Sequence, residues 1–183
     1  MDLERRLLSA ADAEVRIGGA GSITGHAAVF NSMSEDLGGF REIILPGAFS
    51  RALAQRQDVT ALFNHNPDLL LGRTTNGTLT LSVDSRGLLA TISPPPTPTA
   101  EEVRTLVRGG YLTGMSFAFR VPPGGESWRD TPEGTVRHVA DLDLYDVSVV
   151  TTPAYLGTSV SARARPGAAG ASVELLRLRL MLS

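Results

Sequence analysis

The stretch LTGMSFAFRV, residues 112–121, is the clearest strand signal in the sequence, because its two alternating sets of side chains differ sharply. Successive side chains of a β-strand point to opposite faces. One face is bulky and apolar and belongs in a core: Met115, Phe117, Phe119 and Val121. The other face carries small residues around the hydroxyl of Ser116, as a nucleophile needs if a carbonyl carbon is to approach. A small-residue face packed against a helix is the competing interpretation.

Short strand patterns separated by turn signals surround this stretch on both sides. They cover residues 14–18, 22–30, 58–65, 69–73, 77–83, 87–93, 136–140 and 142–151. Two helices are expected, over residues 45–53 and 99–109, and a turn is expected at Asn66-Pro67. We expect residues 122–134, which contain Trp128, to form a polar loop. This pattern predicts a mainly β fold with flanking helices, in the form of a β-barrel or sandwich.

A chain of 183 residues predicts one domain. We expect an N-terminal arm at residues 1–13 with a polar, helical start, and a domain at residues 14–160. Residues 161–183 read as a flexible linker and a short C-terminal tail, because small residues predominate at their start. The N-terminal residues lack the apolar core of a secretion signal, which argues for the cytoplasm. No stretch has the apolar length of a membrane span, so we expect no membrane partner.

The composition removes several kinds of chemistry. The chain has no Cys, and all 17 of its basic residues are Arg, which excludes thiol nucleophiles, thiolate metal sites and lysine-based catalysis. Against 19 acidic residues this leaves a net charge of −2, so no cationic excess indicates nucleic acid as a partner. Three dispersed His make a poor ligand set, so we expect neither a metal nor an organic cofactor.

His65 is the best candidate for a general base. It ends the strand pattern of residues 58–65, and alternation puts it on one face with Val59, Ala61 and Phe63. An imidazole at such a position is partly buried and has a defined tautomer. A purely structural histidine is the competing interpretation, and it suits His26 and His138 better.

Asp146 is the candidate acid. Strict alternation places it on the face of Leu142, Leu144 and Val150. A carboxylate in that row costs several kcal/mol of desolvation unless a donor meets it. An imidazole N–H is one such donor, and Arg120 and Arg137 offer alternative ones. A hydroxyl, an imidazole and an acid are what nucleophilic acyl transfer requires, but the order His, Ser, acid matches no common triad.

Six blocks of sequence together resemble the prohead protease family of tailed bacteriophages. They occur in the family's order and spacing between residues 14 and 163. The blocks are residues 25–30, Pro46-Gly47-Ala48-Phe49, Asn64-His65-Asn66, Leu71-Gly72-Arg73, Gly114-Met115-Ser116-Phe117 and residues 146–155.

This resemblance implies a serine endopeptidase with the barrel-like fold of the herpesvirus capsid-maturation protease, assemblin. It implies that His65 is the general base and Ser116 the nucleophile. The third member falls where relatives usually have Glu and this chain has Asp146. The herpesvirus relatives use a second His there, which keeps His138 as a rival.

The resemblance also implies a location and partners. Proteases of this family are packaged inside the procapsid, in the host bacterial cytoplasm. There they remove the scaffold or the N-terminal scaffolding segment of the major capsid protein, and they commonly cleave themselves. The implied partners are the major capsid protein precursor and a scaffold protein, and the relation to assemblin allows a homodimer. We expect residues 161–171 to be the region of autoprocessing.

Two other functions are alternatives at this point. One is a catalytically silent capsid-assembly or scaffold-binding module on the same barrel. The presence of His65, Ser116 and Asp146 together argues against it. The other is an unrelated β-barrel binding domain, which would make the order of the six blocks a coincidence. The cleavage-site sequence and a phage, prophage or gene-transfer-agent origin stay open.

Overall fold

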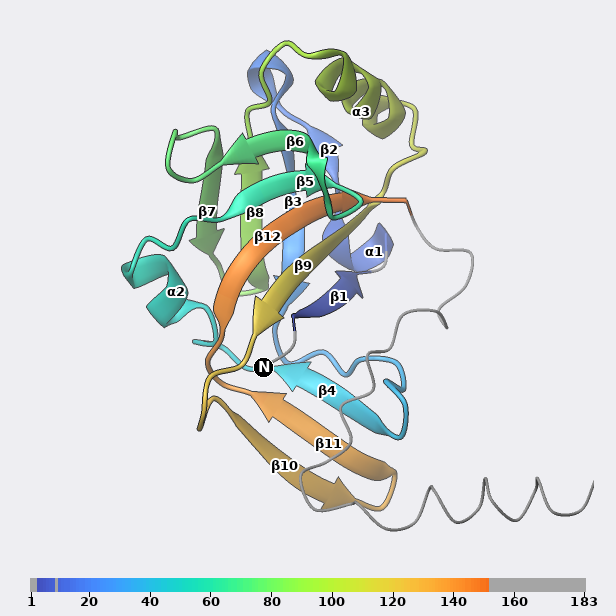
Figure 1. The fold of residues 1–183 in the computed structure, drawn as a ribbon. Helices are drawn as coiled ribbons and strands as arrows, with labels where there is room; N and C mark the ends of the chain where they lie inside the picture. Colours follow the sequence, from blue (N-terminus) through green and yellow to red (C-terminus); the bar gives the residue numbers. More distant parts are fainter. Residues whose placement is uncertain (1–2, 9, 152–183) are drawn as a thin grey trace, which may run out of the picture.

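Strands dominate the structure and pair into three sheets (Figure 1). The computed structural model describes residues 3–8 and 10–151. The largest sheet has five strands in the order β1-β9-β12-β5-β6, which span Glu4–Leu8, Gly114–Arg120, Asp143–Val150, Thr60–Phe63 and Asn66–Arg73. β9 pairs antiparallel with both β1 and β12, and β12 runs parallel to β5. The strand that contains Ser116 therefore lies inside this sheet.

A four-stranded sheet packs against β9 through its strand β3. Its order is β2-β3-β8-β7, with bounds Arg16–Ile17, Ile23–Val29, Gly87–Ile92 and Leu79–Val83. The approach is close at Gly25, where a Cβ atom would lie 2.9 Å from the Met115 Sδ. Glycine at this position therefore allows the two sheets to come together.

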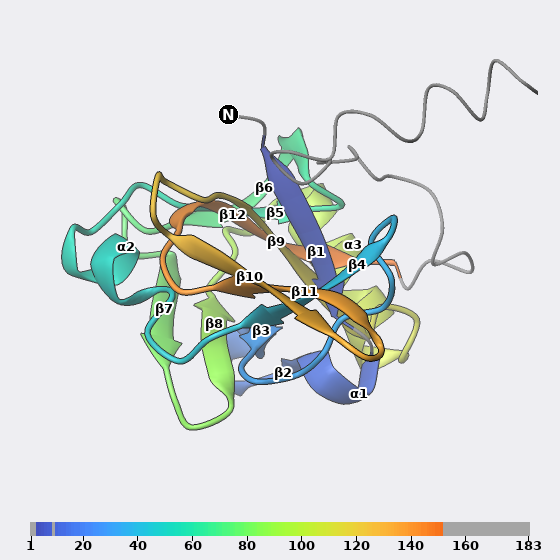
Figure 2. The same cartoon turned by 90° about the horizontal axis from the view of Figure 1, so that it is seen from below.

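The third sheet has the order β10-β11-β4, with bounds Glu126–Thr131, Gly134–Val139 and Phe40–Ile44. It forms the lower end of the molecule in Figure 1 and lies nearest the viewer in Figure 2. β10 replaces the loop expected at residues 122–134, so that expectation is wrong. An aromatic contact across the sheet stabilises β10, since Trp128 lies edge-on to Phe40 of β4 with 5.0 Å between ring centroids.

In the part of the chain that the structure describes, three short α-helices lie outside the sheets, at Ala10–Ala13 (α1), Ser50–Ala54 (α2) and Pro98–Arg108 (α3), besides a 3-10 turn at Gly19–Gly21. α3 begins earlier than expected, because the Thr97 hydroxyl accepts the Ala100 N–H at 3.3 Å and Pro98 suits a first turn. α2 begins later than expected, after a turn at residues 46–49. No helix in the described part of the chain is long and apolar enough to cross a membrane.

The bulky face of β9 lies at the centre of the core. Met115, Phe117 and Phe119 are each at most 1% exposed. The Phe117 ring stacks on that of Phe119 and meets Phe49 edge-on, at centroid distances of 4.9 and 5.7 Å. The predicted division of this strand into a bulky face and a small-residue face is therefore confirmed.

The mainly β class with flanking helices is also confirmed, but the strands of the described residues form three open sheets and no closed barrel. Strand number and length fit either arrangement, and only long-range pairing distinguishes them. The expected helical start is wrong for residues 4–8, which form β1 and pair with β9. The expected turn at Asn66-Pro67 is also wrong, since both residues belong to β6. The linker and tail expected at residues 161–183 lie outside the described residues.

Candidate active site

Ser116 lies in the middle of β9, flanked on the same face by residues of both neighbouring strands. Its partner on β1 is Leu7 and its partner on β12 is Ser148. Directly paired residues of antiparallel strands present their side chains to the same face. The Ser116 hydroxyl therefore belongs to the face opposite the aromatic core, together with the side chain of Ser148.

His65 reaches this face from the turn between β5 and β6. Phe63 pairs with Asn66, so Asn64 and His65 form a two-residue hairpin turn, and their φ angles are +54° and +55°. Two successive positive φ values are typical of a type I′ turn, in which Asn is favoured. For a residue with a Cβ such as His65 this backbone region costs about 1–2 kcal/mol.

The observed turn corrects the prediction that His65 continues the face of Val59, Ala61 and Phe63. The chain reverses at Asn64 and His65, so strand alternation ends before His65 is reached. Local alternation could not show this, because the sequence signal for a turn, Asn66-Pro67, lies two residues later.

Contacts with β12 hold the turn in place. The Asn64 N–H donates to the Val149 carbonyl at 3.0 Å, and the Asn64 Oδ1 accepts the Thr151 N–H at 3.1 Å. The His65 N–H donates to the Ser148 Oγ at 3.2 Å. Tertiary contacts of this kind are what allow a strained backbone conformation to persist.

The imidazole of His65 lies between Ser116 and Asp146. Its Nε2 is 2.6 Å from the Ser116 Oγ, and its Nδ1 is 2.6 Å from the Asp146 Oδ1. With the ring proton on Nδ1 and donated to Asp146, Nε2 carries a free lone pair and accepts the Ser116 O–H. This arrangement can transfer a proton from a serine hydroxyl to an imidazole that a carboxylate orients.

A bulge in β12 turns Asp146 toward this face. Leu144 pairs with Phe119, and Asp146 pairs with the adjacent residue Ala118, so Tyr145 is an extra residue in β12. Adjacent residues of β9 point to opposite faces. Leu144 therefore shares the core face of Phe119, whereas Asp146 shares the face of Ala118.

The bulge shows that the predicted grouping of Asp146 with Leu142 and Leu144 on one face is wrong. Strict alternation placed Asp146 with Leu142 and Leu144, but one inserted residue reverses the alternation between Leu144 and Asp146. Asp146 and Val150 do share a face, as predicted, because no further shift interrupts their pairing with β9. The carboxylate thus meets an imidazole outside the apolar core.

The alternative cationic partners of Asp146 have other contacts. Arg137 is fully buried and pairs with Glu4, Glu42 and Glu126. The Arg120 guanidinium lies over the Tyr145 ring, 5.1 Å from its centroid.

The rival third member, His138, lies on β11 in the three-stranded sheet, beside Ser127 and Ile43. The structure brings together Ser116, His65 and Asp146. The Nδ1 of His138 is buried without a hydrogen-bond partner in the described part of the chain, and the contact to His65 Nδ1 comes from Asp146.

Sequence reasoning missed two side chains near the site, Ser148 and Gln57. Ser148 contacts both His65 and Asp146, and its place two residues after Asp146 on one face was a usable signal. Gln57 accepts the Leu144 N–H beside the bulge at 2.9 Å and donates to Asp143 at 2.9 Å. No sequence pattern marked Gln57, because its partners lie 86 and 87 residues further along the chain.

Contacts of Asp143 hold the start of β12 in place. Burial by itself would raise the pKa of Asp143, but the hydrogen bond from Gln57 and the guanidinium of Arg51 outweigh it and lower that pKa. The Arg51 side chain joins α2 to β12 through this contact, at 2.8 Å.

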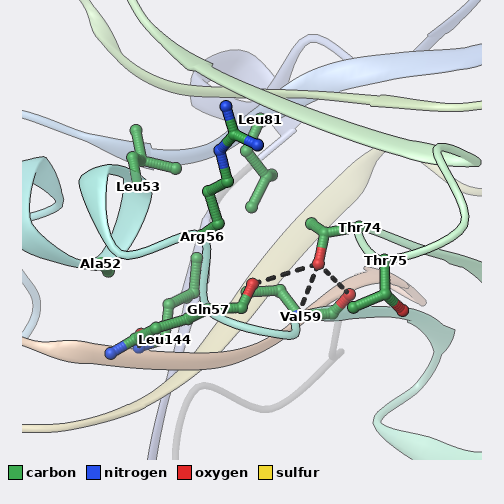
Figure 3. A pocket seen from close by; sticks show the side chains of 9 residues that line it. All are labelled: Ala52, Leu53, Arg56, Gln57, Val59, Thr74, Thr75, Leu81 and Leu144. Atoms are coloured by element: carbon green, nitrogen blue, oxygen red, sulfur yellow. Dashed lines mark hydrogen bonds between the residues drawn. The ribbon is translucent and has the colours of Figure 1, made fainter.

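A hollow of about 380 Å³ lies between α2 and β7 (Figure 3). Leu53 and Leu81 line it, and Gln57 and Thr74 form part of its wall. The Thr74 hydroxyl accepts the Val59 N–H at 2.9 Å, so it fixes the start of β5. The hollow contains none of the three candidate site residues.

Comparisons with known proteins show the family to which the chain belongs and a solved structure with a similar fold. A family model described as caudovirus prohead serine protease matches residues 10–172. The prohead protease of Enterobacteria phage HK97 is 31% identical over 155 residues, which are 81% of this chain and 64% of that relative. The chain thus spans a little under two thirds of that relative's length. The structure of the bacteriophage T4 capsid assembly protease, gp21, matches with a TM-score of 0.54 and 12% identity, over 82% of this chain and 99% of that one. At this identity the match concerns the fold alone.

Proposed function

The chain belongs to the caudovirus prohead serine protease family, and on that premise we propose that it is a serine endopeptidase of capsid maturation. In this proposal Ser116 is the nucleophile, His65 the general base and Asp146 the acid. One observation carries it: the two ring nitrogens of His65 lie 2.6 Å from the Ser116 Oγ and 2.6 Å from the Asp146 Oδ1.

Catalysis begins with the Ser116 hydroxyl. As its oxygen attacks the scissile carbonyl carbon, His65 Nε2 takes the hydroxyl proton, and a tetrahedral oxyanion forms. His65 then donates that proton to the departing amine, which leaves an acyl ester on Ser116. A water molecule deprotonated by His65 hydrolyses the ester and regenerates the hydroxyl. A general base of this kind contributes about 10²- to 10⁴-fold to the rate.

Asp146 acts through His65. By accepting the Nδ1 proton it selects the tautomer in which Nε2 is a free base, and it stabilises the imidazolium that forms during the attack. The resemblance to the family implies Glu at this position, and the Asp side chain is shorter by one methylene group. The shorter side chain reaches the imidazole all the same, since the Asp146 Oδ1 lies 2.6 Å from the His65 Nδ1.

We propose a capsid protein as the substrate class, because the relatives are named as prohead and capsid assembly proteases. The finer form of the proposal is removal of the scaffold or of the N-terminal scaffolding segment of the major capsid protein, inside the procapsid in the host cytoplasm. Self-cleavage within residues 161–171 and action as a homodimer belong to the same proposal.

Co-expression with the cognate capsid precursor tests this function. The wild-type chain is expected to shorten the precursor, and Ser116→Ala is expected to leave it at full length while keeping the wild-type circular dichroism spectrum. Intact-mass spectrometry of the same samples shows whether residues 161–171 are cut only when Ser116 is present.

Cleavage by Ser116→Ala at the wild-type rate would contradict the assigned nucleophile. A precursor that stays at full length with the wild-type chain would instead support the catalytically silent assembly module.

A further inference from the structure

Ser148 occupies the position on β12 directly opposite Ser116. Its side chain is fully buried, and it contacts both remaining members of the site. The Ser148 Oγ is 2.9 Å from the Asp146 Oδ1 and 3.2 Å from the His65 Nδ1. It is also 3.2 Å from the backbone nitrogen of His65.

These three contacts use the whole bonding capacity of a serine hydroxyl, which has one O–H and two lone pairs. The O–H donates to the Asp146 carboxylate, which can only accept. One lone pair accepts the His65 backbone N–H. The second lone pair lies beside the Nδ1–H of His65, whose main acceptor is Asp146 at 2.6 Å. These contacts restrain the orientation of the Asp146 carboxylate, the His65 backbone and the His65 imidazole.

We propose that Ser148 is a positioning residue for the catalytic pair, an inference that rests on the proposed function. Its hydroxyl holds the backbone of His65 and the carboxylate of Asp146 at the same time. It thus sets the distance between His65 Nε2 and the Ser116 Oγ without touching the substrate.

The backbone contact is essential to this role. His65 has a φ of +55°, a conformation that a residue with a Cβ keeps only when its surroundings impose it. The imidazole follows the backbone, so a small rotation at His65 moves Nε2 away from Ser116. Asn64 restrains the turn one residue earlier, and Ser148 is the group that bonds the His65 N–H itself.

The carboxylate contact has a separate effect. The Asp146 Oδ1 accepts from both Ser148 and His65, so the hydroxyl restrains rotation of the carboxylate about its side-chain bonds. Alanine at position 148 would leave the His65 N–H without its acceptor and would free Asp146 to turn. Misplacement of about 1 Å in such a site costs on the order of 10²-fold in rate.

The test measures how fast Ser116 reacts with a fluorophosphonate probe. In this reaction the Ser116 oxygen forms a bond to phosphorus, fluoride leaves, and His65 takes the hydroxyl proton. We expect Ser148→Ala to lower the second-order rate constant by about 10- to 100-fold. We also expect the low-field proton NMR signal of the His65 Nδ1–H to broaden by exchange, which a merely structural role would not cause.

Thr74→Val is the matched control. The Thr74 hydroxyl also accepts a backbone N–H, that of Val59, which directly precedes β5, whereas His65 follows that strand after Asn64. Its loss should lower stability to a similar degree, with the labelling rate within about twofold of wild type, because it touches neither His65 nor Asp146.

Two outcomes would overturn the inference. One is a wild-type labelling rate for Ser148→Ala, with or without a loss of stability. The other is an equal fall in rate for Thr74→Val. Failure of the proposed function looks different: the wild-type chain itself would then not be modified at Ser116, and its labelling would match that of Ser116→Ala.

Discussion

The imidazole of His65 depends on a backbone conformation that its own residue type disfavours. Its φ of +55° is held by neighbouring residues, with Asn64 bonded to Val149 and Thr151 and the His65 N–H bonded to Ser148. The base is therefore positioned by β12, the same strand that supplies the acid. A single strand thus holds both the acid and the backbone of the base.

Substitution of the two candidates for the third member, Asp146 and His138, should affect cleavage very differently. Asp146→Asn removes the acceptor of the His65 Nδ1 proton and favours the wrong tautomer, so we expect precursor cleavage to slow by about 10³- to 10⁴-fold. His138→Ala alters a side chain of the three-stranded sheet, and we expect cleavage at close to the wild-type rate. Rates of precursor shortening, measured on purified folded variants, check both.

A larger loss in His138→Ala than in Asp146→Asn would transfer the third position to His138. Circular dichroism of both variants serves as the control for folding, because Asp146 and His138 both lie within strands.

Two interruptions of regular strand structure bring the side chains of the site together. The bulge at Tyr145 brings Asp146 to the face of Ser116, and the turn between β5 and β6 brings His65 there. Gln57 supports the first by accepting the Leu144 N–H, which the bulge takes out of the regular ladder. Regular strands would have left both groups on other faces.

The turn between β7 and β8 has an acid-sensitive support. The Asp84 Oδ1 accepts the Arg86 and Gly87 N–H groups at 2.8 and 2.9 Å, and the Oδ2 lies 2.9 Å from the His26 Nε2. The Gly87 N–H, with His26 next, lowers the pKa of Asp84 to about 2. A carboxyl whose pKa is lower in the folded chain stabilises the fold above its ordinary pKa, and the stabilisation is lost as pH falls toward 2.

We therefore expect Asp84→Asn to be less stable than wild type at pH 6, by an amount that shrinks between pH 4 and pH 2. The carboxylate side chain is 43% exposed, so solvent screens much of the effect. Urea denaturation of both proteins at several pH values measures the difference. A difference that stays constant from pH 6 to pH 3 would contradict this account.

At the scale of the whole molecule, a buried ion cluster joins β1 to the three-stranded sheet. Arg137 of β11 is fully buried and bonds Glu4 of β1 and Glu42 of β4, at 3.0 and 2.9 Å. Arg6 of β1 reaches the same two glutamates, at 2.8 and 2.7 Å. Burial alone would lower the pKa of Arg137 and raise that of Glu4, but their attraction outweighs it in both cases.

Removal of the central cation should destabilise the fold strongly. Arg137→Met leaves buried carboxylates without their main partner, and breaking a buried ion pair in this way costs about 3–5 kcal/mol. The control is Arg73→Met, which removes an exposed pair with Asp58 and should cost about 1 kcal/mol or less. Urea denaturation followed by far-ultraviolet circular dichroism compares the two. Equal losses in the two variants would contradict the account.

Much of the site was predictable from local sequence. The alternation in residues 112–121 placed Met115, Phe117 and Phe119 in the core and Ser116 on the opposite face, and both placements are observed. The block order in the sequence also indicated the family that the comparisons show. Local patterns sufficed here because β9 is regular from Gly114 to Arg120, with no inserted residue of its own.

Local patterns in the sequence were thus enough for the mainly β class, the family and the face of Ser116. Long-range pairing was needed to show that the sheets of the described residues stay open, that His65 turns away from the β5 face, and that Asp146 lies on the face opposite Leu144. The fold also distinguished Asp146 from His138 as the group beside His65, and it placed Ser148 against both His65 and Asp146. Local patterns stop there because alternation is a property of one strand. A bulge or a left-handed turn is stabilised by partners more than 80 residues distant, as the contacts of His65 and Gln57 with β12 illustrate.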